Sequence, residues 1–405
     1  MRFLKPKLLF TIICAILLTY ALTLNEAYGK GRYYVTQEGS GSKDGTSWEN
    51  AANDLKSLLD NLDNEAEIWV ASGVYSPGTG SDDTFSFKKG LKVYGGFAGT
   101  ESVLEERDAN VNISSLCGGN ISRRVAVVTA HSGALSNDTR LDGFTITGGG
   151  NVLNGGGLHV EISSSPLINE CVFSGNTAFR AGGGVYNYYS SPFIINCNFT
   201  ENKSISDNGG GVSNYYSSPV FENCTFLNNY TNGFGGGMFS YGSKYTVTNS
   251  IFTENRSRYR GAGMSAYSST VTVTNSTFTG NHAEEFGGGM HNEGTLLEVE
   301  NCVFSNNRTI PGNGGGMANV NSSGVISGCK FTTNTADYYG GGIANFESAL
   351  HISDCIFKEN KAVRFNGGGI VNWKSTISID NSQFIDNVAI EGEEIYNYES
   401  NPVVR

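Results

Sequence analysis

Aromatic residues recur at one position of a repeat along much of the chain, at steps of 26 or 27 residues. If these side chains point outward and stack, they form an exposed apolar stripe. Such stripes often mark binding sites, and aromatic rings can stack on the faces of sugar rings. The alternative is a sheet surface in which the rings only support one another. The candidate ligand-binding residues are Tyr188, Tyr215, Tyr241 and Tyr267 and, after Glu293 and Val320, Phe346 and Trp373, with Tyr398 continuing the column.

Carboxylates that could act as general acids or bases do not gather in one place. Glu222, Glu300 and Asp380 share one position of the repeat but lie three repeats apart. Glycosidases need two carboxylates within about 10 Å of each other. Glu298 and Glu300 face the same way, but no basic residue is stacked on them. We therefore predict no catalytic residue.

The nearest mixed cluster of charges joins two equivalent loops of adjacent repeats. One loop carries Arg256, Arg258 and Arg260, and the other carries Glu284 and Glu285. Exposed pairs of this kind are commonly solvated and contribute little. We predict a solvated ion-pair patch here.

The histidines are too far apart to bind one metal ion. His159 and His291 occupy the same position of the repeat but lie five repeats apart, which is roughly 24 Å at the spacing of neighbouring strands. No Cys-x-x-Cys pair and no phosphate-binding or dinucleotide-binding glycine motif is present. We predict no metal and no cofactor.

Cysteine and serine share a position two residues before a recurring phenylalanine, so their side chains should point inward with it. Because Ser250, Ser276 and Ser382 occupy this position in some repeats, the requirement is for a small buried residue, and we expect reduced thiols. Disulfides between coils are the alternative, since stacked strands lie within disulfide reach. The cysteines of the column are Cys171, Cys197, Cys224, Cys302, Cys329 and Cys355.

Three residue types define the repeat that positions these side chains. Glycine triplets begin at Gly155, Gly182, Gly209, Gly235, Gly261 (as Gly-Ala-Gly), Gly287, Gly314, Gly340 and Gly367. A phenylalanine follows 17 residues later, or 18 in the first unit, at Phe173, Phe199, Phe226, Phe252, Phe278, Phe304, Phe331, Phe357 and Phe384. Three residues further comes an asparagine, at Asn176, Asn202, Asn229, Asn255, Asn281, Asn307, Asn334, Asn360 and Asn387.

Each unit contains three short stretches in which apolar residues alternate with others, separated by glycine, asparagine or aspartate corners. This pattern predicts one coil of a parallel β-helix with three strands and three corners, and helical solenoids are excluded because a 3.6-residue period is absent. The fold class is therefore all-β, with about twelve stacked coils. The asparagine column should form an amide ladder from coil to coil. The segment after each asparagine should be an exposed loop.

Residues 30–125 do not repeat and are expected to form an N-terminal cap followed by the first strands, with the array at 126–405. Strands are predicted at Tyr33–Val35, Ile68–Ala71, Gly90–Phe97 and Phe144–Thr147. A capping helix is predicted over Trp48–Leu62, with Thr46 and Ser47 before it.

Residues 1–29 are predicted to be a cleaved signal peptide, with a basic start and an apolar run from Leu8 to Leu24. An uncleaved membrane anchor is the alternative, and no later segment is apolar enough to span a membrane as a helix. The location is then secreted or at the outer cell surface. The formal net charge of −11 argues against nucleic acid and anionic lipid as partners.

The paired motifs Phe252-Thr-Glu-Asn255 and Gly340-Gly-Gly-Ile343 resemble the repeats of the chlamydial polymorphic outer membrane proteins. More widely, the chain resembles secreted bacterial right-handed β-helix proteins of the pectin-lyase-like superfamily, through phrases such as Val93-Tyr-Gly-Gly-Phe97 and Leu141-Asp-Gly-Phe144. This resemblance covers about residues 33–400 and implies a right-handed, single-stranded parallel β-helix.

We therefore expect a surface β-helix module for adhesion or carbohydrate binding, with polysaccharides or cell-surface glycans as partners. The alternative implied by the resemblance is a polysaccharide lyase or glycoside hydrolase, and a third is a structural piece of a larger envelope protein. Near the end of the sequence, Glu393 and Glu394 replace the last two glycines of a triplet. They either discourage pairing at that edge or leave an edge that associates end to end with a second copy.

Overall fold

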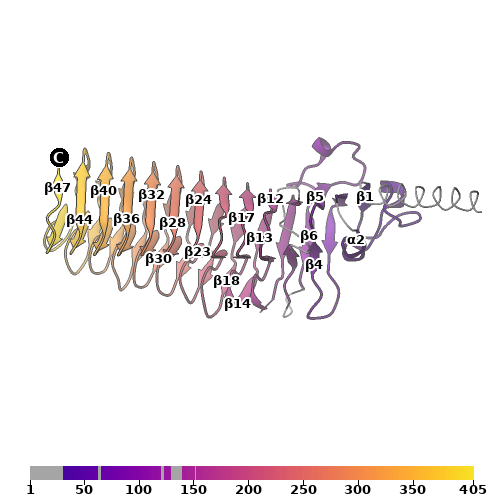
Figure 1. Cartoon of the computed structure of the whole chain (residues 1–405), viewed down its shortest axis with the longest axis horizontal. Coiled ribbons are helices and arrows are strands. Elements are labelled where there is room, and N and C mark those ends of the chain that lie inside the picture. Colours follow the sequence, from indigo (N-terminus) through magenta and orange to yellow (C-terminus); the bar gives the residue numbers. More distant parts are fainter. Residues whose placement is uncertain (1–30, 63–64, 120–122, 129–138, 151) are drawn as a thin grey trace, which may run out of the picture.

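Each repeat folds into one coil of a solenoid in the computed structural model, which describes residues 31–62, 65–119, 123–128, 139–150 and 152–405. Strands of successive coils pair in parallel and form four sheets of 14, 12, 12 and 9 strands, here called A, B, C and D. The coils follow one another along a straight stack, with the C-terminal coil at one end (Figure 1). The predicted all-β fold of about twelve coils is confirmed, since sheets B and C each hold 12 strands.

Sheets A and B form two faces of the solenoid. Sheet A consists of β1 Arg32–Val35, β2 Glu67–Ala71, β5 Lys92–Phe97, β8 Arg140–Asp142, β12 Leu167–Asn169, β16 Phe193–Ile195, β20 Val220–Glu222, β24 Lys244–Thr248, β28 Thr270–Thr274, β32 Leu296–Glu300, β36 Ser323–Ser327, β40 Ala349–Ser353, β44 Thr376–Asp380 and β47 Val403–Val404. Sheet B consists of β3 Gly73–Tyr75, β6 Ser114–Cys117, β9 Phe144–Thr147, β13 Val172–Ser174, β17 Asn198–Thr200, β21 Thr225–Leu227, β25 Ile251–Thr253, β29 Thr277–Thr279, β33 Val303–Ser305, β37 Lys330–Thr332, β41 Ile356–Lys358 and β45 Gln383–Ile385.

Sheets C and D complete the coil. Sheet C consists of β4 Phe85–Phe87, β7 Ala126–Val128, β11 Leu158–Val160, β15 Val185–Tyr188, β19 Val212–Tyr215, β23 Met238–Tyr241, β27 Met264–Tyr267, β31 Met290–Glu293, β35 Met317–Val320, β39 Ile343–Phe346, β43 Ile370–Trp373 and β46 Ile395–Tyr398. Sheet D consists of β10 Val152–Asn154, β14 Thr177–Ala181, β18 Lys203–Ser204, β22 Tyr230–Thr231, β26 Arg256–Ser257, β30 His282–Ala283, β34 Arg308–Thr309, β38 Thr335–Ala336 and β42 Lys361–Ala362.

Sheet D corrects the prediction of three strands per coil. It lies directly after the asparagine column, in the segment expected to be wholly an exposed loop, and most of its strands are only two residues long. Two residues are too short to show alternation in a sequence. A fourth left-handed corner, such as Glu254 with a φ of 53°, turns the chain from sheet B into this short strand.

The core consists of identical side chains stacked from coil to coil. The Phe226 and Phe252 rings are 4.4 Å apart and parallel within 2°, and the rest of the phenylalanine column stacks in the same way. Beside it, the Asn281 amide donates to Asn307 Oδ1 at 2.9 Å and to the carbonyl of Phe252 at 2.9 Å. The predicted amide ladder is confirmed. The column cysteines are buried free thiols, and each donates to a backbone carbonyl, as Cys302 does to Glu300 at 3.2 Å.

The glycine triplet is required by the turn into sheet C. Gly235 has a φ of +70°, which favours glycine. A Cβ atom at Gly237 would lie 2.5 Å from the carbonyl oxygen of Gly263 in the next coil. The triplet therefore lets neighbouring coils approach closely where the chain enters each strand of sheet C.

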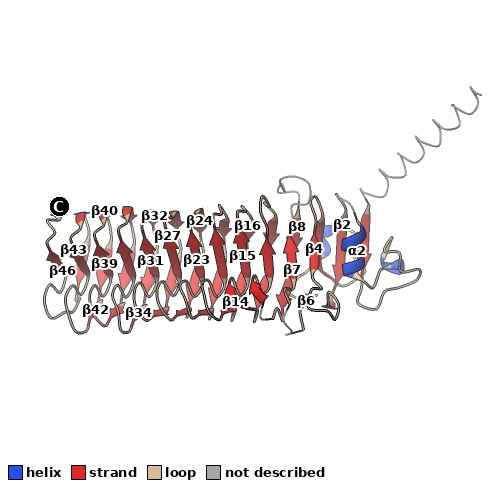
Figure 2. Cartoon of the chain, turned by 60° about the horizontal axis from the view of Figure 1, so that its bottom comes forward, coloured by secondary structure: helices blue, strands red, loops and turns tan. Residues whose placement is uncertain are grey.

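The N-terminal helix is shorter than predicted. The segment divides into a 3-10 turn at Trp48–Asn50 (η1) and the helix α2 at Leu55–Asn61, whose N-cap is Asp54 rather than Thr46 or Ser47. The reason is that residue 52 is held extended by pairing with the backbone of Tyr34. Helix α2 buries Leu55 and Leu59 in the core and packs beside β4, the first strand of sheet C (Figure 2).

The other predicted strands lie where expected, at β1, β2, β5 and β9. The predicted signal peptide, residues 1–29, lies outside the described residues. In the part of the chain that is described, no helix is long and apolar enough to cross a membrane. At the last coil, Tyr398, Val403 and Val404 are exposed, and end-to-end association there stays a prediction.

Candidate functional site

The outward aromatic column lies at the end of the sheet C strands. The in-register pairing of sheet C places Tyr188, Tyr215, Tyr241 and Tyr267 side by side on four consecutive coils. Glu293 and Val320 interrupt the column on the next two coils. The structure therefore brings these four tyrosines into one group.

Phe346 and Trp373 begin a second group, which Tyr398 completes. The Trp373 and Tyr398 rings stack at 4.0 Å. Phe346 packs edge to face on Phe286, at 5.8 Å between centroids. These two candidates are thus partly engaged with other aromatic rings, and they lie apart from the first group.

A hollow of about 320 Å³ opens within the first group. Its lining comes from three consecutive coils. It includes three tyrosines of the column and other, mostly aromatic, residues beside them. The lining residues are Asn208, Tyr215, Tyr216, Phe234, Phe239, Tyr241 and Tyr267. We call this hollow the aromatic pocket.

Phe239 forms the buried centre of the aromatic pocket. Its ring lies 5.5 Å from Tyr215 and 5.8 Å from Tyr267. The equivalent positions on the two neighbouring coils are Ser213 and Ser265. Because these serines are small, they leave space on both sides of Phe239, and Phe234 from the preceding loop closes one side at 5.3 Å from Tyr267.

The tyrosines of the pocket present neutral hydroxyl groups. Asn208 Nδ2 donates to the Tyr215 hydroxyl at 3.2 Å. Burial raises the pKa of Tyr215 to about 12, and burial raises the pKa of Tyr267 as well. Tyr241 is more open than Tyr215 and Tyr267, with 38% of its surface exposed. The pocket thus offers aromatic faces and polar, uncharged groups.

A single arginine beside the pocket pairs with two carboxylates. Arg260 Nε lies 3.0 Å from Glu285, and Arg260 Nη1 lies 2.7 Å from Glu293. The Arg260 guanidinium also packs over Phe286 at 5.0 Å from the ring centroid. The predicted ion-pair patch therefore forms through Arg260 and Glu285, but its second carboxylate is Glu293 rather than Glu284. Glu293 is the residue that interrupts the aromatic column.

A serine, a histidine and a carboxylate lie in a row at this patch, but the serine and the histidine are sealed from solvent. Ser265 Oγ lies 3.3 Å from Nδ1 of His291, and Nε2 of His291 lies 3.9 Å from Glu293. Ser265 and His291 are both fully buried. Burial, with Arg260 close by, holds the pKa of the His291 imidazole well below its usual range. A buried serine cannot reach a polymeric substrate, so this row serves packing.

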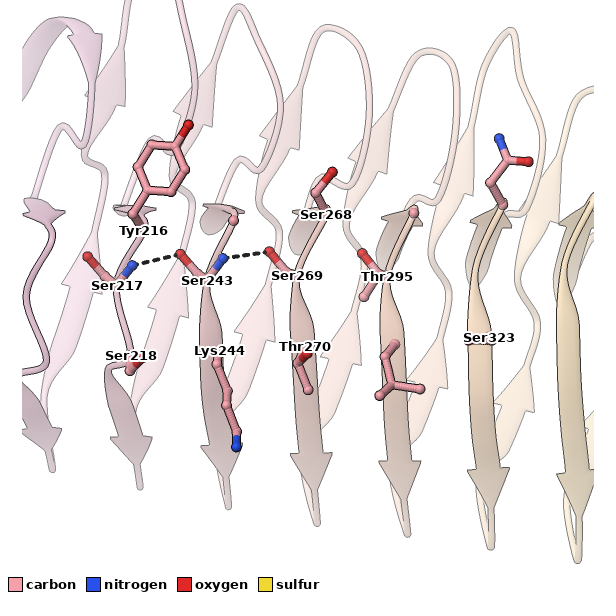
Figure 3. A pocket seen from close by; sticks show the side chains of 14 residues that line it. Tyr216, Ser217, Ser218, Ser243, Lys244, Ser268, Ser269, Thr270, Thr295 and Ser323 are labelled. Carbon is pink, nitrogen blue, oxygen red and sulfur yellow. Dashed lines mark hydrogen bonds between the residues drawn. The ribbon is translucent and has the colours of Figure 1, made fainter.

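A second hollow of about 540 Å³ lies around the corner between sheets C and A. Its floor is a row of serines in which the Ser217 N–H donates to Ser243 Oγ at 3.1 Å and the Ser243 N–H to Ser269 Oγ at 3.2 Å (Figure 3). Tyr216 stands at its first coil and Asn321 at its last. We call this hollow the hydroxyl trough.

The trough exists because the corner residues between its ends are small. Gly242, Ser268 and Gly294 occupy the left-handed corner on the three coils between Tyr216 and Asn321. Elsewhere in the stack the same corner carries larger side chains, such as Tyr189, Glu347 and Lys374. Four coil steps at the spacing of neighbouring strands make the trough roughly 19 Å long.

The isolated carboxylates remain separate, as predicted. Glu222, Glu300 and Asp380 share one register of sheet A and lie three coils apart. Among the described residues, no group of three His, Cys, Asp or Glu side chains is arranged to hold a metal ion.

A buried carboxylate that sequence reasoning missed lies near the N-terminal end. Asp142 is fully buried and pairs with Arg107 and Arg140, each at 2.6 Å. Arg107 also donates to the carbonyl of Gly95 at 3.0 Å. Arg140 and Asp142 are neighbours on β8, but Arg107 lies 35 residues before Asp142 and outside the repeat, so no spacing in the sequence links it to them. Because Asp142 is covered, the cluster holds the loop of Arg107 against sheet A.

A comparison with protein families agrees with the fold. The family model described as "Right handed beta helix region" matches residues 126–296, so the solenoid is a right-handed parallel β-helix. Pectate lyase Pel9A is similar at 13% identity and a TM-score of 0.39, covering 92% of this chain and 78% of that one. Tailspike protein 3 of bacteriophage CBA120 is similar at 14% identity and a TM-score of 0.37, covering 91% and 61%. A rhamnogalacturonan lyase gives 12% identity and a TM-score of 0.20, covering 86% and 74%.

No curated protein sequence matches the chain. At these identities and TM-scores, the solved structures say nothing about activity, and function rests on the geometry of this chain.

Proposed function

We propose that this protein is a secreted or cell-surface β-helix module that binds carbohydrate at the aromatic column, in the manner of an adhesin. The observation that carries the proposal is the aromatic pocket, in which Tyr215, Tyr241 and Tyr267 surround a hollow on three consecutive coils. Concave sites lined by aromatic side chains with a few polar groups are the usual form of a ligand site.

The chemistry of the pocket suits a sugar ring. The axial C–H groups of a pyranose are weakly positive, and the face of an aromatic ring is weakly negative, so the two stack. Tyr241 offers such a face to solvent, while Asn208 and the tyrosine hydroxyls can bond to sugar hydroxyl groups. A single good stacking contact is worth about 1 kcal/mol.

A repeated fold also suits a repeated ligand. Strands of sheet C present equivalent positions at the spacing of the coils, roughly 4.8 Å, so a chain lying along the solenoid meets one coil after another. The second aromatic group, with Phe346 and Trp373, lies further along the same column and offers a separate contact surface.

Substitution of the exposed rings tests the proposal. Tyr241→Ala should weaken glycan binding about fivefold, as the loss of about 1 kcal/mol implies, and the double variant Tyr215→Ala/Tyr241→Ala should abolish retention on a glycan array. Phe365→Ala removes a similarly exposed aromatic ring, 41% exposed, that does not line the pocket. This control should bind like the unchanged protein, and circular dichroism should show all variants folded.

Two results would contradict this function. One is an unchanged array profile for the folded double variant. The other is release of unsaturated sugar products from an acidic polysaccharide in a reaction that stops when calcium is removed, which would favour a polysaccharide lyase.

A further inference from the structure

The aromatic pocket and the hydroxyl trough meet at one residue. Tyr216 lines both hollows. It sits at the left-handed corner directly after Tyr215, and 45% of its surface is exposed. Its ring lies 5.4 Å from that of Tyr241 and nearly perpendicular to it, at 88°. The two hollows therefore lie on either side of a single aromatic side chain.

We infer that the pocket and the trough form one extended site for an uncharged, linear oligosaccharide that crosses Tyr216 and continues along the solenoid axis. This inference rests on the proposed function and specifies its ligand class. The aromatic pocket receives the face of a terminal ring, and the trough receives the hydroxyl groups of the units that follow.

The side chains that line the two hollows carry almost no charge, and this favours an uncharged ligand. None of the described residues that line the aromatic pocket is charged, and the arginine beside it is paired with two carboxylates. Among the fourteen residues that line the trough, Lys244 is the only charged one. A polyuronate carries one negative charge per sugar unit and would find a single cation over about 19 Å. The whole chain, at a formal charge of −11, would also repel it.

The trough is rich in groups that bond to hydroxyls. Ser218, Ser268, Thr270 and Ser323 line it, together with the amide of Asn321. In Figure 3 the side chains of Ser218, Lys244 and Thr270 lie below the serine row, and those of Tyr216 and Ser268 lie above it. Ligand hydroxyls placed over the row thus meet polar groups on both sides.

The corner column supplies a substitution that fills the trough without changing the backbone. Ser268 has a φ of 47°, and the native tyrosines at the same corner, Tyr189 and Tyr216, have φ values of 46° and 51°. Ser268→Tyr is therefore compatible with the corner and places a ring in the trough. Glu347 is exposed, has a φ of 49° and lies three coils further along, outside the trough. Glu347→Tyr is the matched control.

The test is isothermal titration of the full chain with linear hexasaccharides of glucose, mannose, xylose and galactose and with hexagalacturonate. We expect at least one neutral hexasaccharide to bind at least tenfold more tightly than hexagalacturonate and than its own disaccharide. Ser268→Tyr should weaken that binding at least tenfold, and Glu347→Tyr should change it less than twofold.

The outcomes separate this inference from the proposed function. Tighter binding of hexagalacturonate, or binding that Ser268→Tyr leaves unchanged while Tyr241→Ala removes it, overturns the extended neutral site but leaves the aromatic pocket as a glycan site. Failure of every glycan to bind, on the array as well as in titration, contradicts the proposed function and this inference together.

Discussion

Removal of one amide from the ladder should destabilise the solenoid by about 4 kcal/mol. The Asn281 side chain makes four hydrogen bonds. Its Nδ2 donates to Phe252 O and Asn307 Oδ1, both at 2.9 Å, and its Oδ1 accepts from the Asn255 N–H and Nδ2 at 3.1 and 3.0 Å. A buried hydrogen bond is worth about 1 kcal/mol net, so Asn281→Ala should cost about 4 kcal/mol.

Urea unfolding followed by circular dichroism measures the global loss. Hydrogen exchange is needed as well, because a repeat array can open coil by coil rather than in one step. The backbone N–H of Asn255 loses its acceptor, Asn281 Oδ1, in this variant. Its hydrogen should exchange about a thousandfold faster, as 4 kcal/mol implies. Thr277→Ala, on the outward face of the same coil, is the control and should stay within about 0.5 kcal/mol.

The reasoning fails if Asn281→Ala costs less than about 1 kcal/mol and leaves exchange at Asn255 unchanged. That result would mean that sheet pairing alone holds the coils in place and that the ladder contributes little.

Three further predictions concern other parts of the molecule. Asp142→Asn removes the buried carboxylate that pairs with Arg107 and Arg140 and leaves Arg107 only its exposed partner Glu170, so it should cost about 3 kcal/mol and make the loop around Arg107 sensitive to protease. Cys329→Ser should cost less than about 1 kcal/mol in urea unfolding, because Ser276 fills the same buried column in another coil. Since the folded-state pKa of Tyr215 is raised to about 12, the unfolded chain loses the phenol proton first. Stability should therefore hold below about pH 10 and fall between pH 10 and 12, as measured by thermal unfolding beside tyrosine absorbance.

The fold was predictable because every coil repeats the same physical requirements. Glycine is needed where the chain enters sheet C, phenylalanine fills the core and asparagine bonds to the next coil, so the three residue types recur together. The predictions failed where no residue type recurs at one position of the repeat. Sheet D is too short to show alternation, and the helix predicted at Trp48–Leu62 is interrupted because residue 52 pairs with the backbone of Tyr34.

The candidate site was only half predictable for the same reason. Tyr215 and Tyr241 belong to a column, so their register was visible. Phe239 occupies a position that is serine on both neighbouring coils, and Phe234 comes from a loop whose path the repeat does not determine. For the trough, the sequence offered one signal. Tyr216 directly follows Tyr215, so its side chain could be expected to point outward at an exposed corner.

A crystal structure with the tightest-binding neutral oligosaccharide tests the central claim most directly. We predict one sugar ring stacked on Tyr241 in the aromatic pocket, with the chain crossing Tyr216 and running along the serine row toward Asn321. An oligosaccharide bound on another face of the solenoid, with the aromatic pocket empty, would contradict it.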